Sequence, residues 1–196
     1  LLNLNKKNDD FEKLKIQGGA LKKGNFDDLD FKNFYNFLSE NVSRKLKTHQ
    51  IKAAYHLYKI RSGANFSVPG SGKTTVVLSV YEKLRLEKQV NLIFVVGPPS
   101  CFGPWQHEFK STLNRVPRVQ KNAGNNSAKR KSSYYNVSDN GPELYLTSFH
   151  SLYNDQAEAE IFFNNIKNNI FLIIDEAHYI KQIGGVWANT ILSLAK

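Results

Sequence analysis

The 196-residue sequence has one cysteine, no methionine and no long apolar run. The single cysteine, Cys101, excludes an internal disulfide framework and is typical of a reducing compartment. No stretch approaches the roughly 18 apolar residues that a membrane span needs, and the polar start, residues 1–10, does not resemble a secretory signal. We therefore expect a cytoplasmic protein, nucleoid-associated if it is prokaryotic, with no membrane partner. Because the chain starts with Leu and lacks methionine, we expect either a fragment of a longer protein or a sequence from which residues are missing.

Acidic residues are also scarce. Lys and Arg total 27 against 17 Asp and Glu, which gives a formal net charge of +10. A protein of this charge tends to bind polyanions, nucleic acid first, although plain solubility is an alternative explanation. The imbalance is largest in residues 110–138, the basic stretch, which has no Asp or Glu and contains Lys110, Arg115, Arg118, Lys121, Lys129, Arg130 and Lys131. The stretch is either a DNA contact, which the lack of acid slightly favours, or a solvated loop.

Apolar residues recur at two spacings, and together these predict an α/β fold. Short continuous apolar runs predict strands that are buried on both faces, at residues 64–68, 91–96, 143–147 and 170–174. Helical spacing predicts helices at 29–46, 48–62, 74–86, 103–113 and 155–166, a short basic helix at 127–137 and a helical segment at the end. This alternation predicts a three-layer domain with a mostly parallel central sheet. We place a partly helical N-terminal extension at 1–45 and the main domain at 46–196.

Residues 67–75 have the composition of a phosphate-binding loop. They follow a predicted strand and open a predicted helix, which is the context that such a loop requires, although Ser replaces the first glycine of the usual pattern. Gly70 and Gly72 allow the backbone to point several N–H groups at one phosphate. Lys73 can reach the β and γ phosphates, and the Thr74 hydroxyl can ligate Mg²⁺. The residues predicted to bind the nucleotide are Gly70, Ser71, Gly72, Lys73, Thr74 and Thr75, with Lys73 also catalytic.

Two adjacent carboxylates follow the last predicted strand. The sequence Phe-Leu-Ile-Ile-Asp-Glu-Ala-His ends at His178 and places Asp175 and Glu176 just past the carboxyl end of a buried strand, where parallel α/β sheets bind ligands. We expect Asp175 to hold Mg²⁺ through water, and Glu176 to orient and deprotonate the attacking water. Together with the phosphate loop, this acidic pair predicts ATP and Mg²⁺ binding.

The segment Leu-Lys-Thr-His-Gln, residues 46–50, lies about one helix before the phosphate loop. It resembles the Leu-Arg-x-Tyr/His-Gln segment that opens superfamily 2 motors, in which the Gln amide pairs with the adenine edge. An amide has both a donor and an acceptor, so it can select adenine over guanine. The resemblance implies that Gln50 reads the base.

Three further segments resemble SWI/SNF-type ATPases. They are Val-Val-Gly-Pro-Pro-Ser at 95–100 with Trp105 after it, Leu-Tyr-Leu-Thr-Ser-Phe at 144–149, and Asp-Glu-Ala-His-Tyr-Ile-Lys at 175–181, a DEAH box. The resemblance, over residues 46–196, implies a first RecA-like lobe that works with a second lobe carrying arginine fingers. It also implies a double-stranded DNA partner, nucleic-acid contacts and a coupling residue after the acidic pair. The resemblance assigns the DNA contacts to Ser100, Thr147 and Ser148. It assigns the coupling role to His178.

This sequence departs from that family before the phosphate loop, where Ser-Val-Pro replaces an acidic lead-in and favours a distant, prokaryotic branch. The leading hypothesis is the ATP-binding lobe of a DNA translocase that hydrolyses ATP. Alternatives are a strand-separating helicase, the motor subunit of a restriction or phage-defence complex, and a nucleotide-switched DNA-binding module. We expect Trp105 to lie in the core rather than stack on a base, and Cys101 to be a buried apolar residue.

Overall fold

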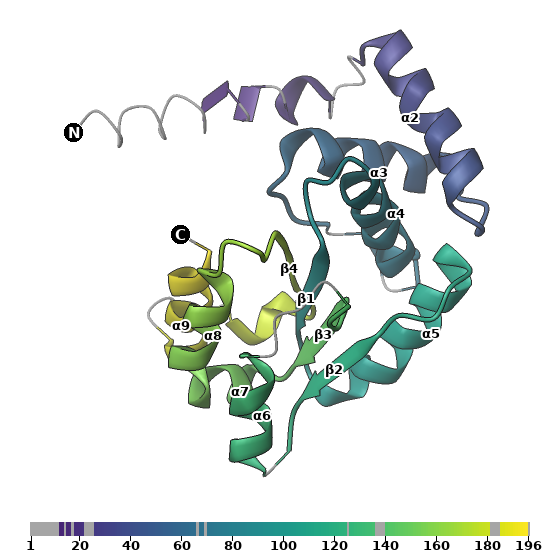
Figure 1. Cartoon of the computed structure of the whole chain (residues 1–196). Coiled ribbons are helices and arrows are strands. Elements are labelled where there is room, and N and C mark those ends of the chain that lie inside the picture. The colour runs from purple at the N-terminus through teal and green to yellow at the C-terminus, as the bar shows by residue number, and fades with distance from the viewer. Residues whose placement is uncertain are drawn as a thin grey trace. The chain divides into compact units, whose positions relative to one another are not determined.

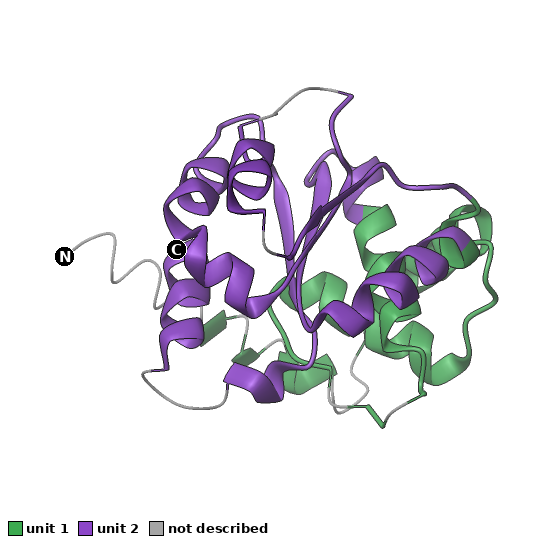
Figure 2. Cartoon of the chain, turned by 90° about the horizontal axis from the view of Figure 1, so that it is seen from below, with its two compact units in different colours: residues 1–83, 111–114 green, residues 84–110, 115–196 purple. Residues whose placement is uncertain are grey.

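The computed structural model describes residues 12–13, 15–16, 18–21, 26–65, 67–68, 70–124, 126–135, 140–180 and 185–195. The chain forms two compact units, which Figure 2 colours separately. Unit 1 comprises Leu1–Lys83 and Ser111–Asn114, and unit 2 comprises Leu84–Lys110 and Arg115–Lys196. Within the predicted extension at 1–45, most of residues 1–24 lies outside the described residues.

Unit 1 is helical. Its main elements are α2 (Asp28–Asn41), α3 (Thr48–Ile60) and most of α4 (Lys73–Leu86). The Asp27 side chain caps α2 by accepting the Asp30 N–H at 2.9 Å, which satisfies one of the free donors of the first turn. Phe34 and Tyr55 are almost fully buried and meet edge to face with ring centroids 5.4 Å apart. This aromatic contact joins α2 to α3.

Unit 2 is built on a sheet of four parallel strands. The strands are β1 (Leu92–Val96), β2 (Val119–Asn122), β3 (Leu144–Thr147) and β4 (Ile170–Ile174), in the order β2-β3-β1-β4. All five residues of β1 are buried, because this strand is central and apolar on both faces. Phe94 is in register with Tyr145 of β3 and Leu172 of β4.

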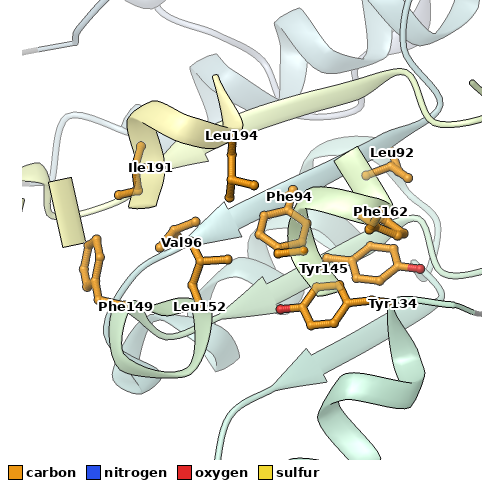
Figure 3. Packing of buried hydrophobic residues seen from close by; sticks show 11 residues of the cluster. Leu92, Phe94, Val96, Tyr134, Tyr145, Phe149, Leu152, Phe162, Ile191 and Leu194 are labelled. Atoms are coloured by element: carbon orange, nitrogen blue, oxygen red, sulfur yellow. The ribbon is translucent and has the colours of Figure 1, made fainter. Parts of the chain in front are cut away.

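Helices cover both faces of this sheet. Four helices, α6 (Ser127–Ser133), α7 (Phe149–Asn154), α8 (Gln156–Phe163) and α9 (Val186–Leu194), lie on one side, and α5 (Phe102–Leu113) lies on the other (Figure 1). Figure 3 shows the core on the first side, where Tyr145 and Phe162 have centroids 4.8 Å apart. Short 3-10 helices, η1 (Pro99–Cys101) and η2 (Ala177–Ile180), follow β1 and β4. The predicted three-layer α/β fold is confirmed.

The strand predicted at 64–68 is wrong for its described residues, none of which is in a strand. Val68 is 72% exposed rather than buried. The physical reason is local: the Asn65 side chain accepts hydrogen bonds from both the N–H and the hydroxyl of Ser67. Such side-chain turns compete with the extended backbone that a strand needs.

Other boundaries differ by a few residues. The helix predicted at 29–46 ends at Asn41, where Val42 turns to an extended conformation, and the helix predicted at 155–166 ends at Phe163. The sequence interpretation missed β2 and α7. Only Asn122 is buried among the four residues of β2, so this edge strand lacks the apolar run that would identify it.

Candidate functional site

The phosphate loop of unit 1 has the backbone that its glycines allow. Gly70 and Gly72 have φ angles of +78° and +79°, in the left-handed region that favours glycine. A Cβ at Gly70 would meet no atom within 4 Å, whereas a Cβ at Gly72 would collide with Nε2 of Gln50. The loop is therefore open at its tip and closely packed where the helix starts. Pro69 lies outside the described residues.

Lys73 is the first residue of α4 and folds back over the loop. Its Nζ donates to the Ser67 carbonyl at 2.9 Å and to the Val68 carbonyl at 3.4 Å. Both bonds are to neutral acceptors, so a phosphate that carries full charge can compete for the ammonium group. Thr74 is partly exposed, whereas Thr75 is 2% exposed and its hydroxyl accepts from Arg44 at 3.4 Å.

Gln50 is held against the phosphate loop. Its Nε2 donates to the Ser71 carbonyl at 2.8 Å, and its Oε1 accepts the Lys47 N–H at 2.8 Å. The second bond also closes the first turn of α3, because it satisfies a backbone donor at the helix start. The predicted adenine reader therefore contacts the phosphate loop directly, through an amide that has both polar atoms engaged in this structure.

The acidic pair belongs to unit 2, at the carboxyl end of β4. The Asp175 N–H donates to the Val96 carbonyl at 2.8 Å, which extends the β1–β4 ladder by one residue. The Asp175 carboxylate accepts from Trp105 Nε1 at 2.8 Å through Oδ2, and from the Glu176 N–H at 3.0 Å through Oδ1. Trp105 itself is 3% exposed. It lies in the core as predicted, but it also has a polar partner that the sequence did not suggest.

Glu176 leaves the sheet with a φ angle of +52°, an uncommon conformation for a residue with a side chain. Such backbone typically costs about 1–3 kcal/mol and tends to occur at functional positions. The side chain is 55% exposed, and its Oε2 lies 3.1 Å from Nδ1 of His178. The residue predicted to act as a base and the residue predicted to couple are thus in direct contact.

Cys101 lies beside the Asp175 carboxylate. Burial, followed by the Asp175 charge and a hydrogen bond to it, raises the pKa of the Cys101 thiol to about 12. The thiol therefore stays protonated and adds no second negative charge. A Cβ at Gly97 would lie 3.0 Å from the Cys101 sulfur and 3.1 Å from the Asp175 Cβ. The ends of β1 and β4 are close together here because residue 97 is glycine.

The three residues predicted to contact nucleic acid differ in accessibility. Ser100 is exposed on η1. Thr147 is fully buried, and its hydroxyl donates to the Asn122 carbonyl at 3.1 Å. Ser148 caps α7 by accepting the Ser151 N–H at 3.1 Å. A phosphate contact stays a prediction for all three, and for Thr147 it would require the bond to Asn122 to open.

Several charges of the basic stretch are paired with acids from outside it. Arg130 is 7% exposed and binds Asp155, and this carboxylate raises the pKa of the guanidinium. Arg115 lies 2.6 Å from Glu143, and Lys131 lies 2.8 Å from Glu158, whose pKa it lowers. Acidic residues from elsewhere in the sequence therefore neutralise part of the positive charge of residues 110–138. Its exposed lysines are Lys110, Lys121 and Lys129.

The sequence interpretation also missed an apolar groove in unit 2. It has a volume of about 460 Å³ and is bordered by Pro98, Gly124 and stacked aromatic rings. Phe149 stacks on Trp187 at 5.5 Å and on Tyr179 at 5.7 Å. These rings come from three separate segments, so no sequence motif could have revealed the groove.

Among the described residues, no group of three or more His, Cys, Asp or Glu side chains is placed to hold a metal ion. A search of the same residues finds no helix with the length and apolar character to cross a bilayer. A protein-bound Mg²⁺ would therefore need ligands beyond the side chains of one cluster, as it does when substrate phosphates and water supply most of them.

The fold and the two motifs define a RecA-like lobe of the P-loop NTPases, of the kind found in superfamily 2 motors. The model of the family described as type III restriction enzyme, res subunit, matches residues 40–194, and the chain belongs to this family. Among solved structures, the chain is similar to the Sulfolobus solfataricus SWI2/SNF2 ATPase core in complex with dsDNA. The TM-score is 0.61 with 18% identity, over 78% of this chain and 30% of that chain. No curated protein matches the sequence.

Proposed function

We propose that the chain is the ATP-binding lobe of an ATP-dependent DNA translocase, and that it hydrolyses ATP to drive movement on duplex DNA. The observation that carries the proposal is the phosphate loop, with two left-handed glycines leading into a helix that begins at Lys73. Membership of the restriction-subunit family and the fold of a SWI2/SNF2 ATPase core support it. The family match also favours a second candidate, the motor subunit of a restriction complex.

The residues of the loop fit a nucleotide with Mg²⁺. The backbone at Gly70 is open to solvent, and the buried Ser71 hydroxyl finds no hydrogen-bond partner within the described part of the chain. The Lys73 ammonium group donates to the Ser67 and Val68 carbonyls and can exchange these acceptors for phosphate oxygens. Thr74 and Asp175 would hold Mg²⁺, which would neutralise charge on the phosphates. The backbone N–H groups of residues 70–75 would orient the β phosphate.

Glu176 would act as the general base. Its exposed carboxylate accepts a proton from water, and the bond to His178 fixes its orientation. When the carboxylate becomes protonated or turns toward a substrate, that bond weakens, so His178 can transmit the change to neighbouring residues. This is the coupling role that we assign to His178.

We further propose that double-stranded DNA and a second RecA-like lobe are partners of this lobe. Ser100 and the exposed lysines at 110, 121 and 129 would contact phosphates. A second lobe would supply the arginine finger that typically accelerates phosphoryl transfer by about 10³–10⁵-fold. A nucleotide-switched binding module without turnover is the alternative from another class.

Two variants separate binding from chemistry. Lys73→Ala removes a charge that would face the phosphates, so both nucleotide affinity and turnover should fall. Glu176→Gln preserves the size of the side chain but removes the base, so ATP should still bind while hydrolysis falls about 10²-fold or more. Calorimetric ATP binding and steady-state phosphate release, in the protein with its second lobe, measure the two effects. Equal ATPase rates in the parent and in Glu176→Gln would contradict the proposal.

A further inference from the structure

We propose that Trp105 is a positioning residue for the magnesium site, and that its indole N–H fixes the orientation of the Asp175 carboxylate. The proposal rests on the proposed function, because it needs Asp175 to hold the metal through water. No part of the SWI/SNF-like pattern in the sequence assigns such a role to this tryptophan. The contact joins α5 to the end of β4, across 70 residues of sequence.

The geometry distinguishes this contact from ordinary core packing. A buried indole N–H needs a hydrogen-bond acceptor, and a backbone carbonyl would satisfy it equally well. In this chain the acceptor is one carboxylate oxygen, Oδ2 of Asp175, at 2.8 Å. The other oxygen, Oδ1, accepts the N–H of the next residue at 3.0 Å. Both oxygens are therefore bound by rigid donors, one from the core and one from the main chain.

Two donors on different oxygens fix the rotation of the carboxylate about its Cβ–Cγ bond. Each oxygen keeps lone pairs for the waters of a metal ion, because a carboxylate has about four acceptor positions in all. The donors are uncharged, so the carboxylate retains its full negative charge for the cation. Partners that orient a metal-binding carboxylate typically contribute about 10–100-fold to metal affinity or activity.

Few other side chains could replace the Trp105 indole N–H as a donor to the Asp175 carboxylate. Trp105 is 3% exposed, which fixes its ring. The Cys101 thiol, which also interacts with Asp175, is a weaker donor, and Gly97 leaves room for the Cys101 sulfur and the Asp175 side chain. If the indole N–H were lost, the Asp175 carboxylate would be free to rotate toward the thiol or toward solvent.

The test uses an isosteric replacement. In the Trp187→Phe chain, Trp105 is the one remaining tryptophan. Replacing it with 3-benzothienylalanine exchanges the indole N–H for sulfur and leaves the ring size nearly unchanged, so a packing defect is not introduced. Trp105→Phe serves as a second, genetically encoded variant, and thermal melts confirm that each chain is folded.

The readout is Mn²⁺ affinity in the presence of ADP, measured from free Mn²⁺ by electron paramagnetic resonance. The benzothienyl chain should bind Mn²⁺ about 10-fold or more weakly than its Trp187→Phe parent, while ADP affinity in EDTA stays the same. In an Asp175→Ala background the same replacement should have no further effect, because the two residues then act as one unit.

The outcomes are separable. If the parent chain binds no Mn²⁺ with ADP, the proposed function fails. If the parent binds and the benzothienyl chain binds equally tightly, the proposed function stands and Trp105 is only a core residue. An equal loss of affinity with and without Asp175 would also overturn the positioning role.

Discussion

The Gln50 side chain connects the start of α3 with the phosphate loop. Its amide bonds Ser71 and Lys47 in this structure, and it packs against residue 72, whose φ angle of +79° favours glycine. The same donor and acceptor match the polar edge of adenine. A nucleotide that displaces one of these bonds would therefore alter the phosphate loop as it binds.

If Gln50 reads adenine, the chain should bind ATP more tightly than GTP, and Gln50→Ala should reduce this preference about fivefold. One well-placed hydrogen bond is worth about 1 kcal/mol, and 1.4 kcal/mol corresponds to a factor of ten. Competition binding against a fluorescent ADP measures both affinities. Gln106→Ala is the matched control, because that side chain donates to the Phe102 carbonyl of its own helix. Equal affinities for ATP and GTP in the parent would contradict the assignment.

The sequence predicted the conformation of residues that depends only on their neighbours along the chain. Gly70, Gly72 and Lys73 act through a local backbone path, and the structure has the left-handed glycines that this path requires. The contact of Trp105 with Asp175 could not be predicted, because it depends on how α5 packs beside β4. The bond from the Thr147 hydroxyl to the Asn122 carbonyl was missed because β2 was not identified in the sequence.

Among the elements, α6 changes the interpretation of the basic stretch. Its Arg130 forms two hydrogen bonds with Asp155, at 2.8 and 3.1 Å, and the two side chains are 9% and 0% exposed. Asn126 caps this helix by accepting the Lys129 N–H. The Arg130 charge, which suggested a DNA contact in the sequence, instead forms a buried ion pair that connects α6 to the start of α8.

Arg130→Met should lower the free energy of unfolding by about 3–5 kcal/mol, because it leaves the buried Asp155 charge without its partner. Lys131→Met, next to it on α6, should change stability little, since its partner Glu158 lies nearer the surface. Urea unfolding followed by circular dichroism compares the two.

A double variant tests the cause. Arg130→Met combined with Asp155→Leu should recover much of the lost stability, because no unpaired charge is then buried. If Arg130→Met instead leaves the stability unchanged and weakens DNA binding, the residue belongs to a DNA contact and our structural assignment is wrong.

Strands were predicted correctly where apolar runs are continuous. The prediction failed where polar side chains determine the backbone conformation. The strands β1, β3 and β4 were predicted within one residue because all their residues except Thr147 are apolar. The strand β2 has a polar edge, and residues 64–68 have an apolar composition that an Asn65 turn overrides. In both cases hydrogen bonding outweighs hydrophobic pattern.

For the whole molecule, the class was predictable because its motifs are spaced along the chain in a fixed order. The family membership confirms the superfamily 2 recognition, and the similarity to a SWI2/SNF2 ATPase core confirms the RecA-like fold. The sequence did not predict the division into two compact units, in which residues 111–114 belong with the N-terminal helices. That grouping depends on packing between segments far apart in sequence.

The most direct test of the proposed function is steady-state phosphate release, with and without duplex DNA, from this 196-residue chain alone and from a chain joined to the second lobe that we propose. In our proposal the arginine finger comes from the second lobe, so turnover by this chain alone should be slow and unaffected by DNA, while the two-lobe form should be strongly stimulated. The DNA affinity of the chain should be weak and fall steeply with salt. Rapid, DNA-stimulated turnover by the chain alone would contradict the proposal that it is one lobe of a two-lobe motor.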